Sequence, residues 1–172
     1  MRTCTKSLCL EKVSPHSSLS QTFNWIARVG KSSLTIKYCK NEFSEKQEST
    51  VDATFNQKEI QIDPKTKVGL TIWDTAGQER YHALNVSYYR YSKGALIVYD
   101  VTDKDSFEKV KKWHTELSKY LKDATIMIAG NKCDMVTKTV DENEAVAFAR
   151  SVGAEHFNTS AKSGINVKEV FN

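Results

Sequence analysis

The sequence predicts an α/β fold with a mainly parallel sheet, one antiparallel hairpin at the sheet edge, and helices that flank the sheet. Two short, uninterrupted apolar runs, GALIVYDV (94–101) and TIMIAGN (125–131), are typical of strands buried on both faces. The stretch between them has apolar residues at helical spacing. Strands that alternate with helices indicate a parallel sheet, whose ligands bind at the C-terminal ends of its strands.

The N-terminal part of the chain has the weakest pattern. Residues 1–22 are rich in Ser, Thr and Lys without periodicity, so we predict a disordered segment there and a domain over 23–172. SQTFNWIA (20–27) indicates a strand only weakly, because polar residues precede its apolar ones. KSSLTIKYCK (31–40) then predicts a helix.

Later elements follow in order along the chain. TFNQKEIQID (54–63) and KVGLTIW (67–73) flank a DPKT turn and predict the hairpin. DSFEKVKKWHTELSKYL (105–121) predicts a helix that Asp105 or Ser106 caps. DENEAVAFARSVG predicts a second helix, and EHFN a short last strand.

Composition sets the broad class. With 172 residues, 40% of them hydrophobic and 27% charged, the chain suits one soluble globular domain. A net charge of +4, with no Lys/Arg run interleaved with aromatic residues, argues against a nucleic-acid partner. The 4 cysteines have no metal-binding spacing, and no apolar run approaches the length of a membrane span. We therefore expect free thiols and a cytoplasmic location.

Four polar motifs carry the functional prediction. GKSS (30–33) opens a helix, whereas DTAG (74–77), NKCD (131–134) and TSAK (159–162) each follow a predicted strand. GKSS alone is a weak signal, because a helix can start with these residues without binding phosphate. Four such motifs at the same edge of a parallel sheet predict a nucleotide site.

The order GKS, DTAGQE, NKCD, SAK is similar to that of small GTPases of the Ras superfamily. WDTAGQERYHALNVSYYR and YDVTDKDSFEKVKKW resemble the Rab branch and its endosomal subgroup, and the resemblance covers residues 29–172. It implies a P-loop G domain that binds and hydrolyses GTP with Mg²⁺ and regulates vesicle and endosomal membrane traffic. Implied partners are a GTPase-activating protein, an exchange factor and Rab effectors, at the cytosolic face of those membranes.

The resemblance also implies a role for each motif residue. Lys31 would contact the outer phosphates and Gln78 would orient the attacking water, so both are candidate catalytic residues. Magnesium would be held by Ser32, Thr50 and Asp74. The phosphates would meet Val29, Gly30, Lys31, Ser32, Ser33, Thr50 and Gly77. An ordinary loop threonine is the alternative for Thr50.

Base and effector contacts complete the set. The Asp134 carboxylate would accept from the two donors on the guanine edge, which adenine does not match. The other expected base contacts are Phe43, Asn131, Lys132, Ser160, Ala161 and Lys162. Phe55, Trp73 and Tyr88 resemble the aromatic triad of the Rab effector surface. Phe43 and the triad have the alternative of being ordinary packing residues.

Two departures from the family pattern qualify the expected activity. Trp25 stands where the phosphate loop has its first glycine, and its bulk is expected to strain or occlude the loop. We also expect a G domain that is incomplete at both ends, with a truncated last helix and no cysteine after Cys133 to carry a lipid anchor. The alternatives are therefore a GTP-hydrolysing switch and a nucleotide-weak Rab-like interaction module. NKCD disfavours an ATP-dependent P-loop enzyme.

Overall fold

The computed structural model describes residues 18–24, 28–46, 54–74, 92–121 and 124–171. Within these ranges the strands form one six-stranded sheet in the order β2-β3-β1-β4-β5-β6. β2 runs antiparallel to β3, and the other neighbours are parallel, so the predicted fold class is confirmed. The strands are β1 (Ser18–Asn24), β2 (Thr54–Asp63), β3 (Thr66–Asp74), β4 (Gly94–Asp100), β5 (Thr125–Asn131) and β6 (Glu155–Asn158).

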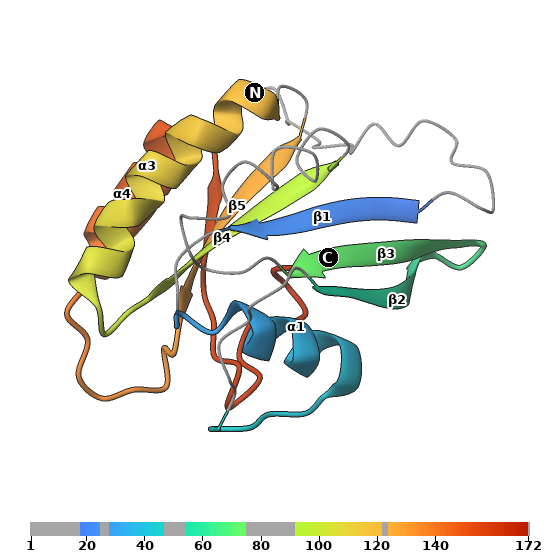
Figure 1. Cartoon of the computed structure of the whole chain (residues 1–172), viewed down its shortest axis with the longest axis horizontal. Coiled ribbons are helices and arrows are strands. Elements are labelled where there is room, and N and C mark those ends of the chain that lie inside the picture. The colour runs from blue at the N-terminus through green and yellow to red at the C-terminus, as the bar shows by residue number, and fades with distance from the viewer. Residues whose placement is uncertain (1–17, 25–27, 47–53, 75–91, 122–123, 172) are drawn as a thin grey trace, which may run out of the picture.

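Helices cover both faces of this sheet. They are α1 (Lys31–Lys40), α3 (Lys104–Tyr120) and α4 (Glu142–Ser151). Figure 1 shows α3 and α4 side by side on one face and α1 on the other. The described part of the chain contains no helix long and apolar enough to cross a membrane.

The apolar patterns seen in the sequence build the core. All seven residues of β4 are buried, as predicted for a strand covered on both faces. Val68, Leu70 and Ile72 of β3 are also buried. Phe107, Val110 and Leu117 form the buried stripe of α3. Their burial fixes the strand ends at which the predicted motifs lie.

β1 differs from the expectation for the N-terminal segment. It begins at Ser18, inside the range predicted to be disordered, and its sequence SLSQTFN is largely polar. It nevertheless occupies the centre of the sheet, where Ser18 pairs with Gly69 of β3 and Gln21 pairs with Gly94 of β4. The backbone hydrogen bonds that β1 makes on both sides do not depend on side-chain character. The apolar periodicity of its sequence therefore gave little indication of a strand. Residues 1–17 lie outside the described ranges.

The helix caps also refine the prediction. Asp103, rather than Asp105 or Ser106, caps α3: its side chain accepts from the Asp105 and Ser106 amides. α4 starts in the same way at Asp141. Gly153 follows the end of α4 with φ +72°, as its predicted place after the helix requires.

Candidate nucleotide-binding site

The site is built on the C-terminal ends of the parallel strands. β1, β3, β4, β5 and β6 each end in Asn or Asp, namely Asn24, Asp74, Asp100, Asn131 and Asn158. The strand order reverses at β1, which has β3 on one side and β4 on the other. Ligands of open α/β sheets bind at such a switch point, outside the carboxyl ends of the strands.

The start of α1 has the shape of a phosphate-binding turn. Gly30 is its N-terminal cap residue and has φ +89°, in the left-handed region that favours glycine. A Cβ at this position would lie 2.5 Å from Asn131 Nδ2. Gly30 has no side chain that could cap the first turn, and such a helix start suits an anion. Val29 is buried just before it, and Ser33 is half-buried just after.

Lys31 and Asp74 form the charged centre of the site. Lys31 is 6% exposed and Asp74 3% exposed. Burial lowers the pKa of Lys31 from 10.5 to about 8, and the Asp74 charge opposes that shift. A buried ammonium that has lost its hydration is well placed to gain from a phosphate. The residues present therefore fit a phosphate group at the start of α1.

Magnesium fits the same corner by the chemistry of its donors. Ser32 follows Lys31 on the first turn of α1, and Asp74 ends β3. Hydroxyl and carboxylate oxygens are the ligands that Mg²⁺ prefers. Thr50, the third predicted ligand, lies outside the described residues.

Asn131 connects three of the predicted motifs. Its side chain is buried, and Nδ2 donates to the Val29 carbonyl at 2.8 Å. Its Oδ1 accepts from the Ala161 amide at 3.2 Å and from Thr159 Oγ1 at 3.5 Å. Asn131 of NKCD thereby links the residues before α1 to TSAK. Thr159 was not among the predicted contacts.

Asp134 is exposed and is held in place by TSAK. The Ser160 hydroxyl donates to Asp134 Oδ1 at 2.5 Å, and the Ser163 amide donates to Ser160 Oγ at 3.0 Å. Ser160 is itself buried. A carboxylate has two acceptor oxygens, so it suits a ligand edge that offers a pair of donors.

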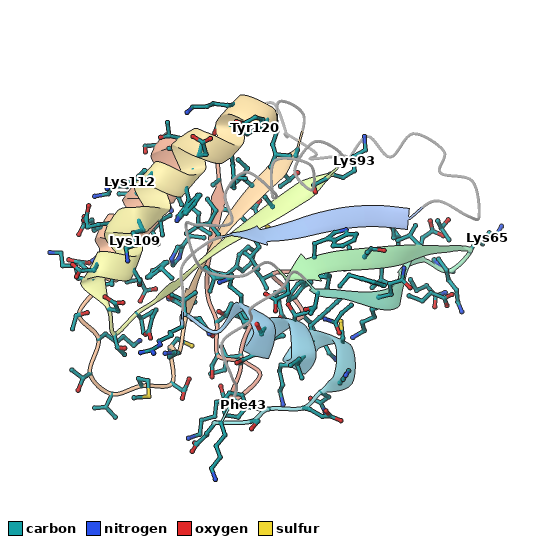
Figure 2. The ribbon with its side chains drawn as sticks, viewed as in Figure 1. Phe43, Lys65, Lys93, Lys109, Lys112 and Tyr120 are labelled. Carbon is teal, nitrogen blue, oxygen red and sulfur yellow. The ribbon has the colours of Figure 1, made fainter. Side chains whose placement is uncertain are left out.

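The loop after α1 approaches TSAK from the other side. Lys162 Nζ forms an ion pair with Glu45 at 2.8 Å, and both groups are exposed. Glu45 follows Phe43 closely in the chain, and Phe43 is 38% exposed. Figure 2 shows the Phe43 side chain on this loop beyond α1. Phe43 is thus not a core residue, which removes the alternative left open for it.

Lys132 has partners that the sequence did not predict. Its Nζ forms an ion pair with Asp100 and donates to the Arg28 carbonyl at 3.3 Å. A carboxylate at the end of the buried run GALIVYD was the available signal for Asp100. It was overlooked because strand-end polar residues also occur where chains simply enter a loop.

Part of the predicted site cannot be placed. Gly77, Gln78, Tyr88 and Trp25 lie outside the described residues. Of the predicted effector triad, Phe55 and Trp73 pair across β2 and β3 with ring centroids 5.4 Å apart. Phe55 is 58% exposed, so its ring is available on the surface.

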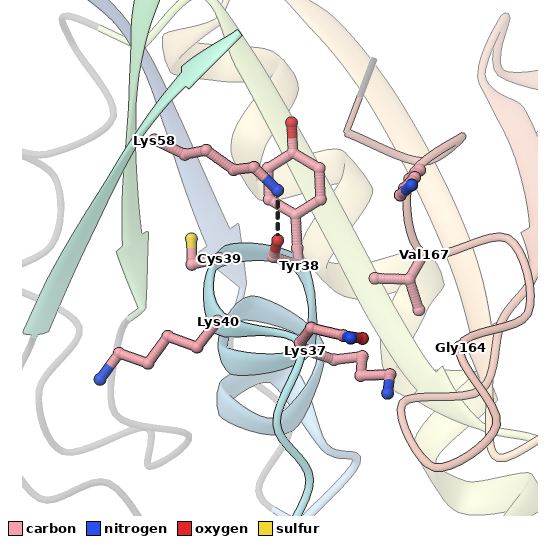
Figure 3. A pocket seen from close by; sticks show the side chains of 9 residues that line it. Lys37, Tyr38, Cys39, Lys40, Lys58, Gly164 and Val167 are labelled. Atoms are coloured by element: carbon pink, nitrogen blue, oxygen red, sulfur yellow. Dashed lines mark hydrogen bonds between the residues drawn. The ribbon is translucent and has the colours of Figure 1, made fainter.

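A separate pocket of about 330 Å³ lies at the other end of α1. Figure 3 shows Lys58 reaching the Tyr38 carbonyl, to which Nζ donates at 2.5 Å. Lys37 and Lys40 occupy the last turn of α1, where cations offset the helix dipole. Lys58 of β2 and Lys168 also line this pocket, which is remote from Lys31.

These contacts define an α/β domain in which a glycine-capped helix start and two strand-end loops meet at one edge of a mainly parallel sheet. A sequence model of the Ras family matches residues 26–172, most of the chain. The chain belongs to the Ras family, and its relatives place it in the Rab branch.

Curated relatives support that placement. The chain is 51% identical over 145 residues to the Ras-related protein Rab-21 of Geodia cydonium, and 50% identical to that of Mus musculus. These matches cover 83% of the chain and 63% and 65% of the relatives, so the chain spans less than two thirds of their length. The Ras-related protein Rab-1D of Dictyostelium discoideum is 43% identical over 145 residues, which are 71% of its length.

Proposed function

We propose that this protein is a Rab-type switch that binds GTP, hydrolyses it to GDP and phosphate, and regulates vesicle and endosomal membrane traffic. The Asn131 side chain carries the proposal, because from NKCD, the base loop, it joins Val29 of the phosphate loop to Ala161 of TSAK. One side chain would thus link the two halves of the proposed nucleotide site. Membership of the Ras family supports the guanine base, and the resemblance of WDTAGQERYHALNVSYYR to the endosomal Rab subgroup supports the endosomal role.

The chain supplies distinct groups to binding and hydrolysis. Lys31 would stabilise the negative charge that develops on the transferred phosphoryl group, and the amides at the start of α1 would hold the phosphates. Bound Mg²⁺, held by Ser32, Asp74 and Thr50, would neutralise charge on the outer phosphates. Gln78 would orient the attacking water for in-line displacement. A GTPase-activating protein, an exchange factor and effectors are the proposed partners.

A nucleotide-weak interaction module is the second candidate. Trp25 in place of the first loop glycine favours it, because an indole needs room where the backbone must turn around a phosphate. The exposed Phe55 ring beside Trp73 would still present the effector surface.

Nucleotide content after purification separates these two candidates. Denaturing the purified chain and separating the released nucleotides by chromatography gives the amount bound per chain. Guanine nucleotide near one per chain supports the switch. A protein that carries none and takes up none from Mg²⁺–GTP is the interaction module.

Base recognition supplies the first mutational prediction. Asp134→Asn should move the preference from GTP towards XTP by about tenfold or more, because xanthine has an acceptor where guanine has its amino donor. Competition against a fluorescent guanine nucleotide measures the ratio. Asp105→Asn removes the same charge from the exposed surface of α3 and should leave the ratio unchanged. An unchanged preference in Asp134→Asn would remove Asp134 from the base site.

A further inference from the structure

Asp100, at the end of β4, holds a buried carboxylate that is fixed on several sides. Its side chain is 9% exposed. Oδ1 accepts from the Thr102 amide at 2.9 Å and from Thr102 Oγ1 at 2.7 Å. Ser106 Oγ accepts from the Asp100 amide at 3.0 Å and donates to the Asp103 carbonyl at 2.6 Å, which holds the backbone of Asp100 in place. The carboxylate is thus preorganised, with Oδ2 directed to Lys132.

Lys132 connects this carboxylate to the phosphate loop. Its Nζ contacts Asp100 Oδ2 and donates to the Arg28 carbonyl at 3.3 Å. Its neighbour Asn131 donates to the Val29 carbonyl at 2.8 Å. Two successive residues of the base loop therefore bind two successive carbonyls of the phosphate loop. A flexible lysine makes such a bond reliably only when its ammonium is held in place.

We propose that Asp100 is a positioning residue for the nucleotide site: it holds the Lys132 ammonium against the Arg28 carbonyl and so fixes the phosphate loop relative to the base loop. The proposal rests on the proposed nucleotide-binding function. Asp100 itself touches neither the base nor the phosphates and acts through Lys132. The ion pair is more than a surface contact, because the Asp100 side chain is only 9% exposed, and loss of the Lys132 charge would leave its carboxylate largely buried without a counter-charge.

A plain structural role would have different consequences. If the pair merely stabilised the end of β4, its loss would loosen residues near Asp100 and leave the phosphate loop unaffected. If Asp100 positions Lys132, its loss should loosen the segment that begins at Arg28, which is remote in sequence. The Lys132 variant should then have the same effect, without addition in the double variant.

Hydrogen exchange of the nucleotide-free chain distinguishes a positioning role of Asp100 from a purely structural role at the end of β4. Asp100→Asn, Lys132→Met and the double variant should each exchange faster over residues 28–34, to the same extent in all three. Glu144→Gln is the matched control, because Glu144 also pairs with a lysine, Lys111 at 3.5 Å, but between α3 and α4. It should leave residues 28–34 unchanged.

Nucleotide release gives the functional readout. Asp100→Asn and Lys132→Met should each release a fluorescent guanine nucleotide about tenfold faster, because a charge-assisted hydrogen bond is lost, while association stays the same. Failure of the unaltered chain to bind nucleotide would refute the proposed function but leave the exchange comparison intact. Unchanged exchange over 28–34 in Asp100→Asn, or faster exchange confined to the end of β4, would overturn the role of Asp100.

Discussion

Arg28 adopts a left-handed backbone conformation, with φ +64°, inside the predicted phosphate loop and two residues before Gly30. A side chain in this region costs about 1–2 kcal/mol relative to the right-handed conformation. Its carbonyl is the acceptor for Lys132. Arg28 is thus under backbone strain at the point where Lys132 of the base loop contacts the phosphate loop.

Replacing that side chain should relieve the strain. Arg28→Gly should raise the free energy of unfolding by about 0.5–1 kcal/mol, the cost of the left-handed conformation less the extra chain entropy of glycine. Gly153→Ala should lower it by about 1 kcal/mol, since Gly153 has φ +72° and an added Cβ would meet nothing within 4 Å. Urea unfolding of the nucleotide-free proteins measures both. A loss of stability in Arg28→Gly would show that the arginine side chain contributes more than its backbone costs.

Sequence motifs predicted some residues of the candidate site but not others. Gly30 and Asn131 were predicted from motifs, and the structure brings them together at the start of α1. Asp100 and Glu45 were not predicted, because each acts through a partner distant in the chain, Lys132 and Lys162 respectively. Ion pairs between residues that are distant in the chain leave no periodic pattern in the sequence, so they cannot be predicted from such a pattern.

At the scale of elements, α3 owes its start to Asp103. Its carboxylate accepts from the amides of Asp105 and Ser106 at 3.0 and 3.3 Å. The sequence predicted the helix and its buried stripe, but placed the cap two or three residues too late. Several polar residues precede the stripe, and helix boundaries depend on backbone geometry that they do not distinguish.

Removal of this cap should destabilise the protein. Asp103→Ala should lower the free energy of unfolding by about 1 kcal/mol, because two amides at the start of α3 lose their acceptor. Asp105→Ala removes an acidic residue from the same turn without removing the cap, so it should cost less, through the helix dipole alone. Chemical denaturation of the two variants gives the comparison. Equal losses would mean that charge, and not capping, accounts for the effect.

Elements with a strong apolar period were predicted, whereas β1 was not. β4 and β5 were recognised because burial on both faces selects an uninterrupted apolar run. β1 has a polar sequence although strands flank it on both sides. Its place follows from pairing with β3 and β4, which is a property of the whole sheet.

At the scale of the whole molecule, stability should depend on pH through His156. Its Nε2 lies 3.0 Å from the Tyr99 hydroxyl. Burial lowers the pKa of His156, although the Glu142 carboxylate opposes that shift. The unfolded chain therefore binds more protons than the folded chain below the unfolded pKa of about 6.5, so stability falls as the pH drops through that value.

The direction of this pH dependence of stability can be tested with one substitution. Between about pH 7.5 and about pH 5.5 the unaltered chain should lose more unfolding free energy than His156→Gln, which does not titrate there. Urea unfolding at the two pH values provides the difference, and the other titrating groups are common to both proteins. A larger loss in His156→Gln would mean that the folded protein favours the charged imidazole.

The central place of β1 has a consequence for how the chain reaches its fold. β2 and β3 form a local hairpin, whereas β1 pairs with residues as far along the chain as Ile97. The two halves of the sheet become one only when this early, polar strand inserts between β3 and β4. Closing such long loops is slow, so we expect insertion of β1 to limit the folding rate. Until then the edges of β3 and β4 are open to pairing with other chains, and aggregation competes with folding.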